Sequence, residues 1–245
     1  MTELIVFIAV GALAQLVDGA LGMAYGVTSA GLLMSLGVPP VVASASIHYA
    51  ETFTCGASGI SHWLAGNVKP QLFLALAVPG VAGALLGVLV AINVPAHWMR
   101  IVLTPYLLGM GLFLLFRAGQ PPGQRSDVPR GTVATGLIAG FVDAVGGGGW
   151  SALTVTTLLA RGMSPRVVVG SVHMAKCVVS IAASISFLLA IGTSHLAAVA
   201  GLIMGGVLAA PFGAVFIRRI PSRLATTLAG LAVIALGTGN LIQLL

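Results

Sequence analysis

The chain has 245 residues, of which 58% are hydrophobic and only 7% are charged, whereas a soluble domain carries about 25% charged residues. Eleven Lys or Arg and five Asp or Glu are too few to cover a water-facing surface, so this composition excludes a soluble enzyme, a nucleic-acid binder and a disordered chain. The net charge of +6 comes from basic residues in short gaps between apolar runs, which indicates an integral membrane protein.

In chain order, the apolar segments cover residues 4–36, 41–64, 71–91, 101–116, 132–160, 167–190, 195–216 and 223–244. A membrane-spanning helix needs about 20 apolar residues, and all but the first and fifth segments are near that length. No Lys or Arg precedes the first segment, so we expect it to be retained rather than cleaved as a signal peptide.

The first and fifth segments are too long for one straight helix. Each contains a Gly-rich stretch that includes an Asp, VDGALGMAYG at 17–26 and VDAVGGGGWS at 142–151. Glycines and a carboxylate at membrane depth predict a helix break. We therefore expect each segment to form two half-helices that fold back on each other and leave the membrane on the side where they entered.

The two breaks belong to an internal repeat. A shift of the sequence by 125 positions aligns Asp18 with Asp143, Gly22 with Gly147, Tyr25 with Trp150 and His48 with His173. The predicted halves are 1–116 and 132–245, and the polar stretch 117–131, rich in Pro, Gly and charge, is expected to be a loop between them.

The basic residues favour the hairpin interpretation of the two long segments. If both return to their starting side, only Arg100 lies on one face and the other face collects Lys69, Arg117, Arg125, Arg130, Arg161, Arg166, Arg218, Arg219 and Arg223. Single crossings would remove this asymmetry. The positive-inside rule then predicts a cytoplasmic 117–131 loop and two extracytoplasmic termini. The expected fold class is an all-α integral membrane protein with two inverted repeats, each a broken hairpin plus three transmembrane helices.

Ionisable residues within the apolar segments are the candidate functional groups, because a charge inside a membrane is costly. His48, Glu51 and Thr52 share one helix face of segment 41–64, and His173 and Lys176 repeat that pattern in segment 167–190. One interpretation is a structural ion pair between Glu51 and Lys176. The other is that Lys176 attracts an anion while Glu51 or the histidines gain and lose a proton.

The breaks offer a second set of candidate groups. Asp18 and Asp143 are expected to cap the following half-helices, and unpaired N–H groups at a helix start bind anions. The aromatic residues that follow the breaks, Tyr25 and Trp150, fit packing or gating. The histidines at segment ends, His62, His97 and His195, receive no role. We find no motif for a metal ion, a cofactor or an enzyme nucleophile.

At this point the residues resemble a known family. The stretch SGISHWLAGNV (58–68), the two Gly-rich breaks and the G-x-x-P turns at 37–40 (GVPP) and 162–165 (GMSP) are similar to those of the sulfite exporter TauE/SafE family, also called the sulfonate-uptake permease group. The resemblance covers essentially the whole chain. It implies a cytoplasmic-membrane carrier for sulfur-containing anions such as sulfite, sulfoacetate or other organosulfonates.

The sequence therefore predicts a secondary transporter for a small sulfur-containing anion, coupled to a proton or sodium gradient. The alternatives are an anion channel or passive facilitator, an intramembrane enzyme that uses Asp18 and Asp143, and a structural membrane subunit. We expect no metal, cofactor or nucleic acid. Lys176→Ala is expected to abolish flux without preventing folding. The predicted substrate-binding residues are Gly22, Tyr25, Thr28, His48, Thr52, Gly147, Gly148, Gly149, Trp150, His173 and Lys176, and the predicted proton-coupling or structural residues are Asp18, Glu51 and Asp143.

Overall fold

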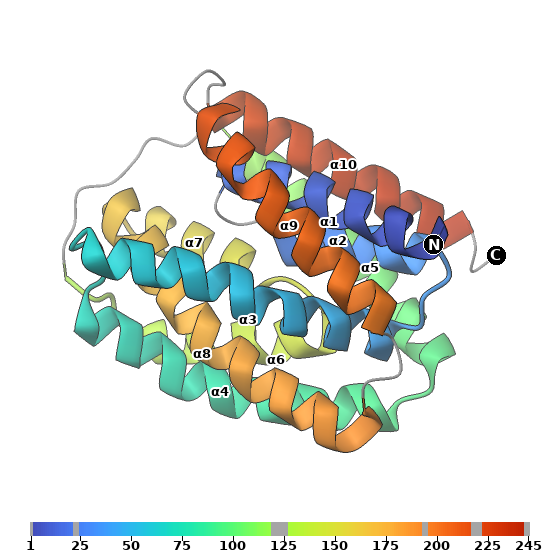
Figure 1. The fold of residues 1–245 in the computed structure, drawn as a ribbon. Coiled ribbons are helices and arrows are strands. Elements are labelled where there is room, and N and C mark those ends of the chain that lie inside the picture. The colour runs from blue at the N-terminus through green and yellow to red at the C-terminus, as the bar shows by residue number, and fades with distance from the viewer. Residues whose placement is uncertain (1, 22–24, 119–126, 193–195, 217–221, 243–245) are drawn as a thin grey trace.

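The computed structural model of the chain describes residues 2–21, 25–118, 127–192, 196–216 and 222–242, and it is all-helical over these ranges (Figure 1). This confirms the predicted secondary-structure class. In order, the helices are α1 (Thr2–Leu21), α2 (Tyr25–Ser35), α3 (Pro40–Leu64), α4 (Pro70–Asn93), α5 (Ala96–Arg117), α6 (Thr132–Gly146), α7 (Trp150–Ala160), α8 (Pro165–Ile191), α9 (Leu196–Phe216) and α10 (Ser222–Ile242).

Both long apolar segments are interrupted where the Gly-rich stretches predicted a break. The first segment is divided between α1 and α2, and residues 22–24, which include the predicted Gly22, lie outside the described ranges. In the second segment α6 ends at Gly146, and Gly147 (φ +69°) and Gly149 (φ +132°) adopt left-handed backbone conformations before α7 begins. A side chain is strained at such a φ, which explains why glycines occupy the break.

The half-helices of the second break return to the end of the molecule from which they started. The Arg161 guanidinium at the end of α7 donates a 2.7 Å hydrogen bond to the Arg130 carbonyl just before α6. With 15 and 11 residues, α6 and α7 are each shorter than a full span of about 20 residues. In Figure 1 α2 likewise runs back toward the end that carries the N-terminus.

The two G-x-x-P motifs form identical turns that end one helix and start the next. Gly37 and Gly162 have φ values of +86° and +82°, and α3 and α8 begin at Pro40 and Pro165. The turn at Gly37 contains the paired hydrogen bonds Gly37 N to Met34 O and Val38 N to Leu33 O, and the turn at Gly162 repeats the same pattern. This is the Schellman arrangement, which satisfies the last carbonyls of a helix.

The other helices, α3, α4, α5, α8, α9 and α10, have 21 to 27 residues each. Among the described residues, Pro70–Asn93, Ala96–Phe116 and Arg166–Ile191 are long and apolar enough to cross a membrane. Several shorter apolar helices accompany them, including Thr132–Gly146 and Trp150–Ala160.

Helices far apart in sequence pair closely through small residues. The main pairs are α1 with α9, α4 with α6, α3 with α8 and α5 with α10. A Cβ atom added at Gly140 would lie 2.2 Å from the Gly80 carbonyl oxygen, and one at Gly205 would lie 2.0 Å from the Ile8 carbonyl oxygen. Such backbone-to-backbone contact is typical of membrane helices, which associate through close packing rather than through the hydrophobic effect.

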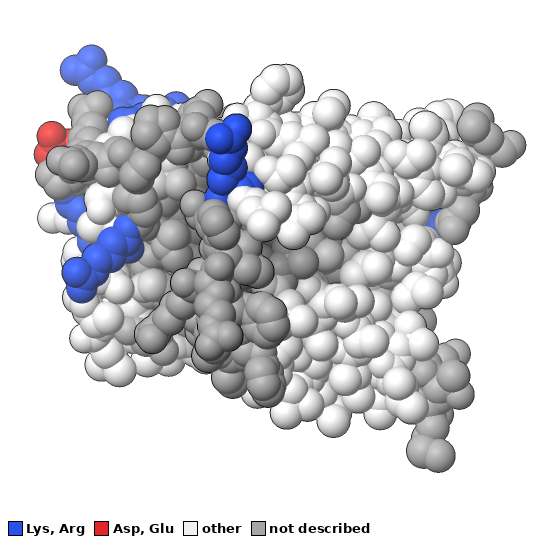
Figure 2. All heavy atoms as spheres, turned by 90° about the horizontal axis from the view of Figure 1, so that it is seen from above, with Lys and Arg blue, Asp and Glu red and all other residues white. Residues whose placement is uncertain are grey.

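The distribution of polarity fits a bilayer environment. Large apolar side chains such as Val78, Leu89 and Leu189 are exposed, whereas charged side chains from three helices are buried. Most of the visible Lys and Arg atoms gather at one end of the molecule in Figure 2. The Arg100 guanidinium donates to the Gly37 carbonyl just before α3, whereas Arg166 donates to Asn67 just after α3, so Arg100 and Arg166 lie at opposite ends. We call the Lys- and Arg-rich end, which includes Arg130, the basic end.

The close contact between α4 and α6 predicts that a single methyl group added at Gly140 will destabilise the protein. Gly140→Ala would force the two backbones apart, and we expect it to lower the free energy of unfolding by about 1–3 kcal/mol. The matched control is Gly109→Ala in α5, where nothing lies within 4 Å of the added Cβ and Ala has the better helix propensity. Denaturant unfolding in detergent measures both variants. Equal effects of the two substitutions would contradict the packing argument.

Candidate functional site

Each break is held by an aspartate that bonds to the start of the following helix. Asp143 Oδ1 accepts a 3.0 Å hydrogen bond from the Trp150 N–H at the start of α7, and Asp18 Oδ1 accepts a 3.0 Å hydrogen bond from the Tyr25 N–H at the start of α2. The first N–H groups of a helix have no partner within the helix itself. Both aspartates therefore fill the capping role that the sequence suggested for them.

The second break contacts the end of the first Gly-rich stretch inside the protein, at Gly26 in the first turn of α2. A Cβ atom added at Gly148 would lie 2.2 Å from the carbonyl carbon of Gly26, and one added at Gly26 would lie 2.7 Å from the Gly148 Cα. The same added Cβ at Gly26 would lie 3.1 Å from Glu51 Oε1. Backbone of the second break, backbone at the start of α2 and a carboxylate from α3 thus meet at one point, and only glycine leaves room for this contact.

Four ionisable side chains form a buried cluster beside this contact. The Lys176 ammonium on α8 forms ion pairs with Asp143 Oδ2 on α6 and, at 2.8 Å, with Glu51 Oε2 on α3. His48 Nε2, also on α3, lies 3.2 Å from Asp143 Oδ2. The four residues are at most 3% exposed. We call His48, Glu51, Asp143 and Lys176 the charge cluster.

Asp143 connects the charge cluster to the backbone of the break. Its Oδ1 caps α7 at Trp150, and its Oδ2 faces both Lys176 and His48. Any change in charge at Lys176 or His48 therefore acts on the carboxylate that holds the start of α7. The sequence suggested Glu51 as a partner of Lys176. It assigned Asp143 only to the cap of the break and did not predict its ion pair with Lys176.

The hydrogen bonds of His48 define the protonation of the cluster. His48 Nδ1 lies 2.8 Å from the Ser44 carbonyl oxygen, which can only accept, so Nδ1 carries a hydrogen. The 3.2 Å contact of Nε2 with Asp143 Oδ2 then needs a second proton between the ring and the carboxylate. With that proton on His48, the positive charges of His48 and Lys176 balance the negative charges of Glu51 and Asp143. A buried site requires such a balance of charge.

The same residues have the spacing of a metal site, but a side-chain cation already lies among them. His48, Glu51 and Asp143 each offer one ligand atom within 4.8 Å of the others. The Lys176 ammonium forms ion pairs with both carboxylates. The chain thus supplies its own cation at this position.

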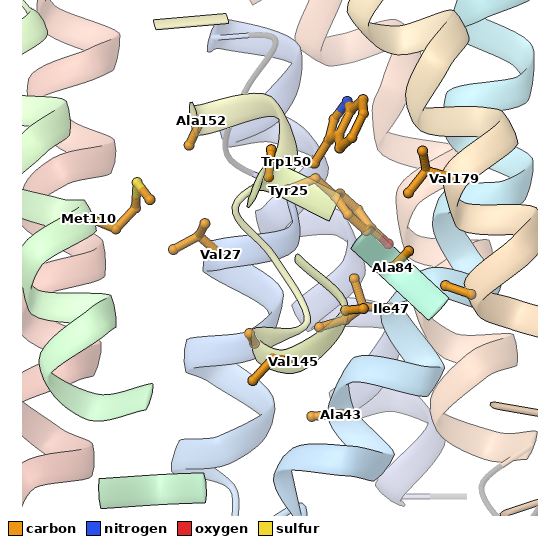
Figure 3. Packing of buried hydrophobic residues seen from close by; sticks show 14 of the residues in the cluster. Tyr25, Val27, Ala43, Ile47, Ala84, Met110, Val145, Trp150, Ala152 and Val179 are labelled. Carbon is orange, nitrogen blue, oxygen red and sulfur yellow. The ribbon is translucent and has the colours of Figure 1, made fainter. Parts of the chain in front are cut away.

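Tyr25 and Trp150 lie in the hydrophobic core (Figure 3). The Trp150 indole N–H donates a 3.2 Å hydrogen bond to the Val172 carbonyl, and its ring is so close to Gly80 that a Cβ there would lie 2.6 Å away. The Tyr25 hydroxyl donates a 3.3 Å hydrogen bond to the Leu202 carbonyl. These contacts fit the packing interpretation of both aromatic residues.

The predicted threonines lie close to the breaks and to α8. Thr28 is buried in α2, and its hydroxyl has no hydrogen-bond partner among the described residues. The buried hydroxyl of Ser180, one turn from Lys176 on α8, also has no hydrogen-bond partner among the described residues. Thr52 donates to the His48 carbonyl at 2.9 Å and lies 3.2 Å from the Ser184 hydroxyl.

His173 is held away from the charge cluster, in contrast to its sequence counterpart His48. Its Nδ1 lies 2.7 Å from the Ser58 hydroxyl, and its ring centroid is 6.0 Å from that of His62. Sequence reasoning missed Ser58, although it lies two helical turns from Glu51 on the same face of α3. It also missed Tyr106, whose hydroxyl donates a 2.7 Å hydrogen bond to the Gly148 carbonyl and which no motif marks.

The charge cluster changes the expected behaviour of Lys176 variants. Removal of the ammonium leaves two buried carboxylates with His48 as their one cationic partner in the charge cluster, so we expect Lys176→Met to lower the free energy of unfolding by about 3–5 kcal/mol rather than leave folding intact. Adding Glu51→Gln in the same chain should restore part of that loss. Thermal unfolding in detergent measures both, with Arg223→Gln at an exposed position as the control. A Lys176→Met protein as stable as the wild type would contradict the ion pairing.

Comparison with known proteins identifies the family. The family model for the sulfite exporter TauE/SafE matches residues 7–239. A relative from Bacillus subtilis (strain 168), described as "Probable membrane transporter protein YtnM", is 40% identical over 252 aligned positions, which cover 99% of this chain and 84% of the relative. Charged groups buried in a bundle of apolar helices, with two helix breaks between them, suit a transporter rather than an enzyme. The chain belongs to the sulfite exporter TauE/SafE family of multi-pass membrane transporters.

Proposed function

We propose that this protein is a secondary transporter that moves a small sulfur-containing anion, sulfite or an organosulfonate, across the cytoplasmic membrane and couples this movement to an ion gradient. The observation that carries the proposal is the Lys176 ammonium, buried with Glu51 and Asp143 beside the contact between the second break and the start of α2. The class of substrate follows from the family, whose description names sulfite.

The charge balance of the site supports coupling. An anion that binds at Lys176 adds a negative charge to a buried cluster that is already neutral, which is strongly unfavourable unless a cation enters with it. Protonation of one carboxylate supplies that charge and releases the ammonium for the substrate. We therefore favour a proton over sodium as the coupling ion.

Glu51 is the carboxylate that takes up the proton in this mechanism. Asp143 is fixed by the Trp150 N–H, by His48 and by Lys176. The Oε2 atom of Glu51 lies 2.8 Å from the Lys176 ammonium but has no well-directed hydrogen bond among the described residues. Glu51 is thus the partner that can leave Lys176 at the smaller cost when an anion replaces it.

The substrate site in this proposal consists of the breaks and the charge cluster. Backbone N–H groups at Gly26 and at residues 147–149 surround the anion oxygens, while residues 22–24 of the first Gly-rich stretch lie outside the described ranges. Lys176 supplies the charge, and His48 and Thr52 line the α3 side. His173, whose Nδ1 lies 2.7 Å from the Ser58 hydroxyl, is not part of this substrate site. The buried hydroxyl of Thr28, which has no hydrogen-bond partner among the described residues, is available to a polar ligand.

The architecture in this proposal is a pair of inverted repeats, 1–116 and 132–245, joined by a cytoplasmic loop at 117–131. The matching aspartate caps at Asp18 and Asp143 and the matching turns at Gly37 and Gly162 support it. The positive-inside rule assigns the basic end to the cytoplasm, which places both termini outside.

Transport in proteoliposomes tests the function. We expect sulfite or sulfoacetate to enter with saturable kinetics and to accumulate when an inward proton gradient is imposed. The Glu51→Gln/Lys176→Gln double variant, which avoids an unpaired carboxylate at position 51, should lose at least tenfold in rate, whereas Arg223→Gln should match the wild type. Wild-type rates in the double variant would rule out the role of Lys176. Flux without saturation or gradient dependence would indicate a passive facilitator instead.

Site-directed labelling tests the orientation. In a background with Cys55→Ala and Cys177→Ala, a membrane-impermeant maleimide added to whole cells should label His97→Cys, which lies near Arg100. It should label Asp127→Cys near the basic end only after permeabilisation. The reverse pattern would place the basic end outside and overturn the assigned orientation.

A further inference from the structure

A line of polar side chains runs along α3 from the charge cluster toward the basic end. Glu51, Cys55, Ser58 and His62 follow one another at spacings of four, three and four residues, so they share one face of the helix. Ser58 contacts His173 on α8 at 2.7 Å, which shows that this face is turned toward α8. Gly59 lets the two helices approach, because a Cβ there would lie 3.0 Å from the Met174 Cα.

Two histidines at the far part of this line are linked to the surface of the basic end. The rings of His62 and His173 lie edge to face, with centroids 6.0 Å apart. The Asn67 side-chain amide donates a 3.1 Å hydrogen bond to His62 Nδ1. Asn67 in turn accepts from Arg166, whose side chain is exposed. The line of polar side chains thus runs from the buried carboxylate of Glu51 to the exposed guanidinium of Arg166.

We propose that His173 and His62 form a proton relay between Glu51 and the basic end of the transporter. This inference rests on the proposed function, in which Glu51 carries the coupling proton. Imidazole is suited to the task because it gains and loses a proton near neutral pH.

The proton balance of the relay is simple. When the anion leaves, the carboxylic acid of Glu51 gives up its proton and re-forms the ion pair with Lys176. The proton moves along the α3 face past Cys55 by way of bridging water, over about two helical turns or roughly 10 Å, to the Ser58 hydroxyl. Ser58 passes a proton to the imidazole of His173, and it then moves to His62 and finally to water at the basic end. Each histidine returns to its starting state, so each cycle moves one proton with the substrate.

The charges around Glu51 and the two histidines favour movement of the proton from Glu51 toward the basic end. Glu51 faces Lys176 on α8, Asp143 on α6 and His48 on its own helix, with Tyr25, Cys55 and Asp18 nearby. Around the histidines the charges are Lys176 toward the cluster and, toward the surface, Arg166 and Lys69, whose backbone N–H bonds the Ser171 hydroxyl at 2.9 Å. Cations at the outer end oppose trapping of a proton on His62 and favour its release to water.

Two flux measurements on the same proteoliposomes separate the relay from the rest of the transport cycle. Net transport driven by a proton gradient needs Glu51 to lose its proton in each cycle. Counterflow exchange of labelled for unlabelled substrate at equal pH does not, because the carrier can remain protonated. With sulfite and sulfoacetate as separate probes, His173→Gln and His62→Gln should reduce net transport at least tenfold and leave exchange within about twofold of the wild type.

His97→Gln at the opposite end is the matched control and should change neither flux. His62 is only half-buried, so His62→Gln keeps the test decisive if His173→Gln does not fold. Equal losses of net transport and exchange would assign the histidines a structural role and overturn the relay, as would unchanged net transport in both variants. A wild-type protein with saturable but pH-independent flux would overturn the relay and the proton coupling, and it would leave the proposed anion transport standing. The lack of flux with either probe would overturn the proposed function and the relay together.

Discussion

The ion pair between Lys176 and Asp143 connects the parts of this protein that matter for transport. One oxygen of Asp143 faces the ammonium on α8, and the other holds the first N–H of α7. An ammonium inside apolar helices is tolerated only where opposite charge and hydrogen bonds surround it. The pair therefore keeps α6, α7 and α8 in register, and a change in charge at Lys176 acts on the carboxylate that holds the start of α7.

The glycines make this arrangement possible because they allow backbone to approach backbone. Without side chains at Gly26 and Gly148 the start of α2 touches the second break, and without one at Gly140 the α6 helix lies directly against α4. Short helices that end inside the protein would otherwise expose N–H and C=O groups to lipid, which is prohibitive. The aspartate caps bond the first N–H groups of α2 and α7, and the backbone contact at Gly26 and Gly148 keeps lipid away from the helix ends.

Much of this could be predicted from the sequence. The composition identified a membrane protein, the positions of Gly and Asp located the breaks, and the helical spacing of His48 and Glu51 placed them on one face of α3. The Gly37 and Gly162 turns were visible as repeated motifs and proved to have the same hydrogen bonds. Other features had no signal in the sequence. Tyr106 reaches Gly148 from a distant helix, and Ser58 was one of several small polar residues on α3.

The partners of the charged residues were decided only by the tertiary structure. The sequence by itself determined that Glu51 and Lys176 lie within apolar helices, because local composition and the helical period depend only on neighbouring residues. It paired Glu51 with Lys176 but assigned Asp143 only to its cap, and it treated His173 as an equivalent of His48. Instead Asp143 joins the ion pair, and His173 turns to Ser58 and His62. The reason is physical: contacts across helices depend on which backbones come close, and that is set by small residues scattered over α3, α4, α6 and α8 rather than by spacing along any one of them.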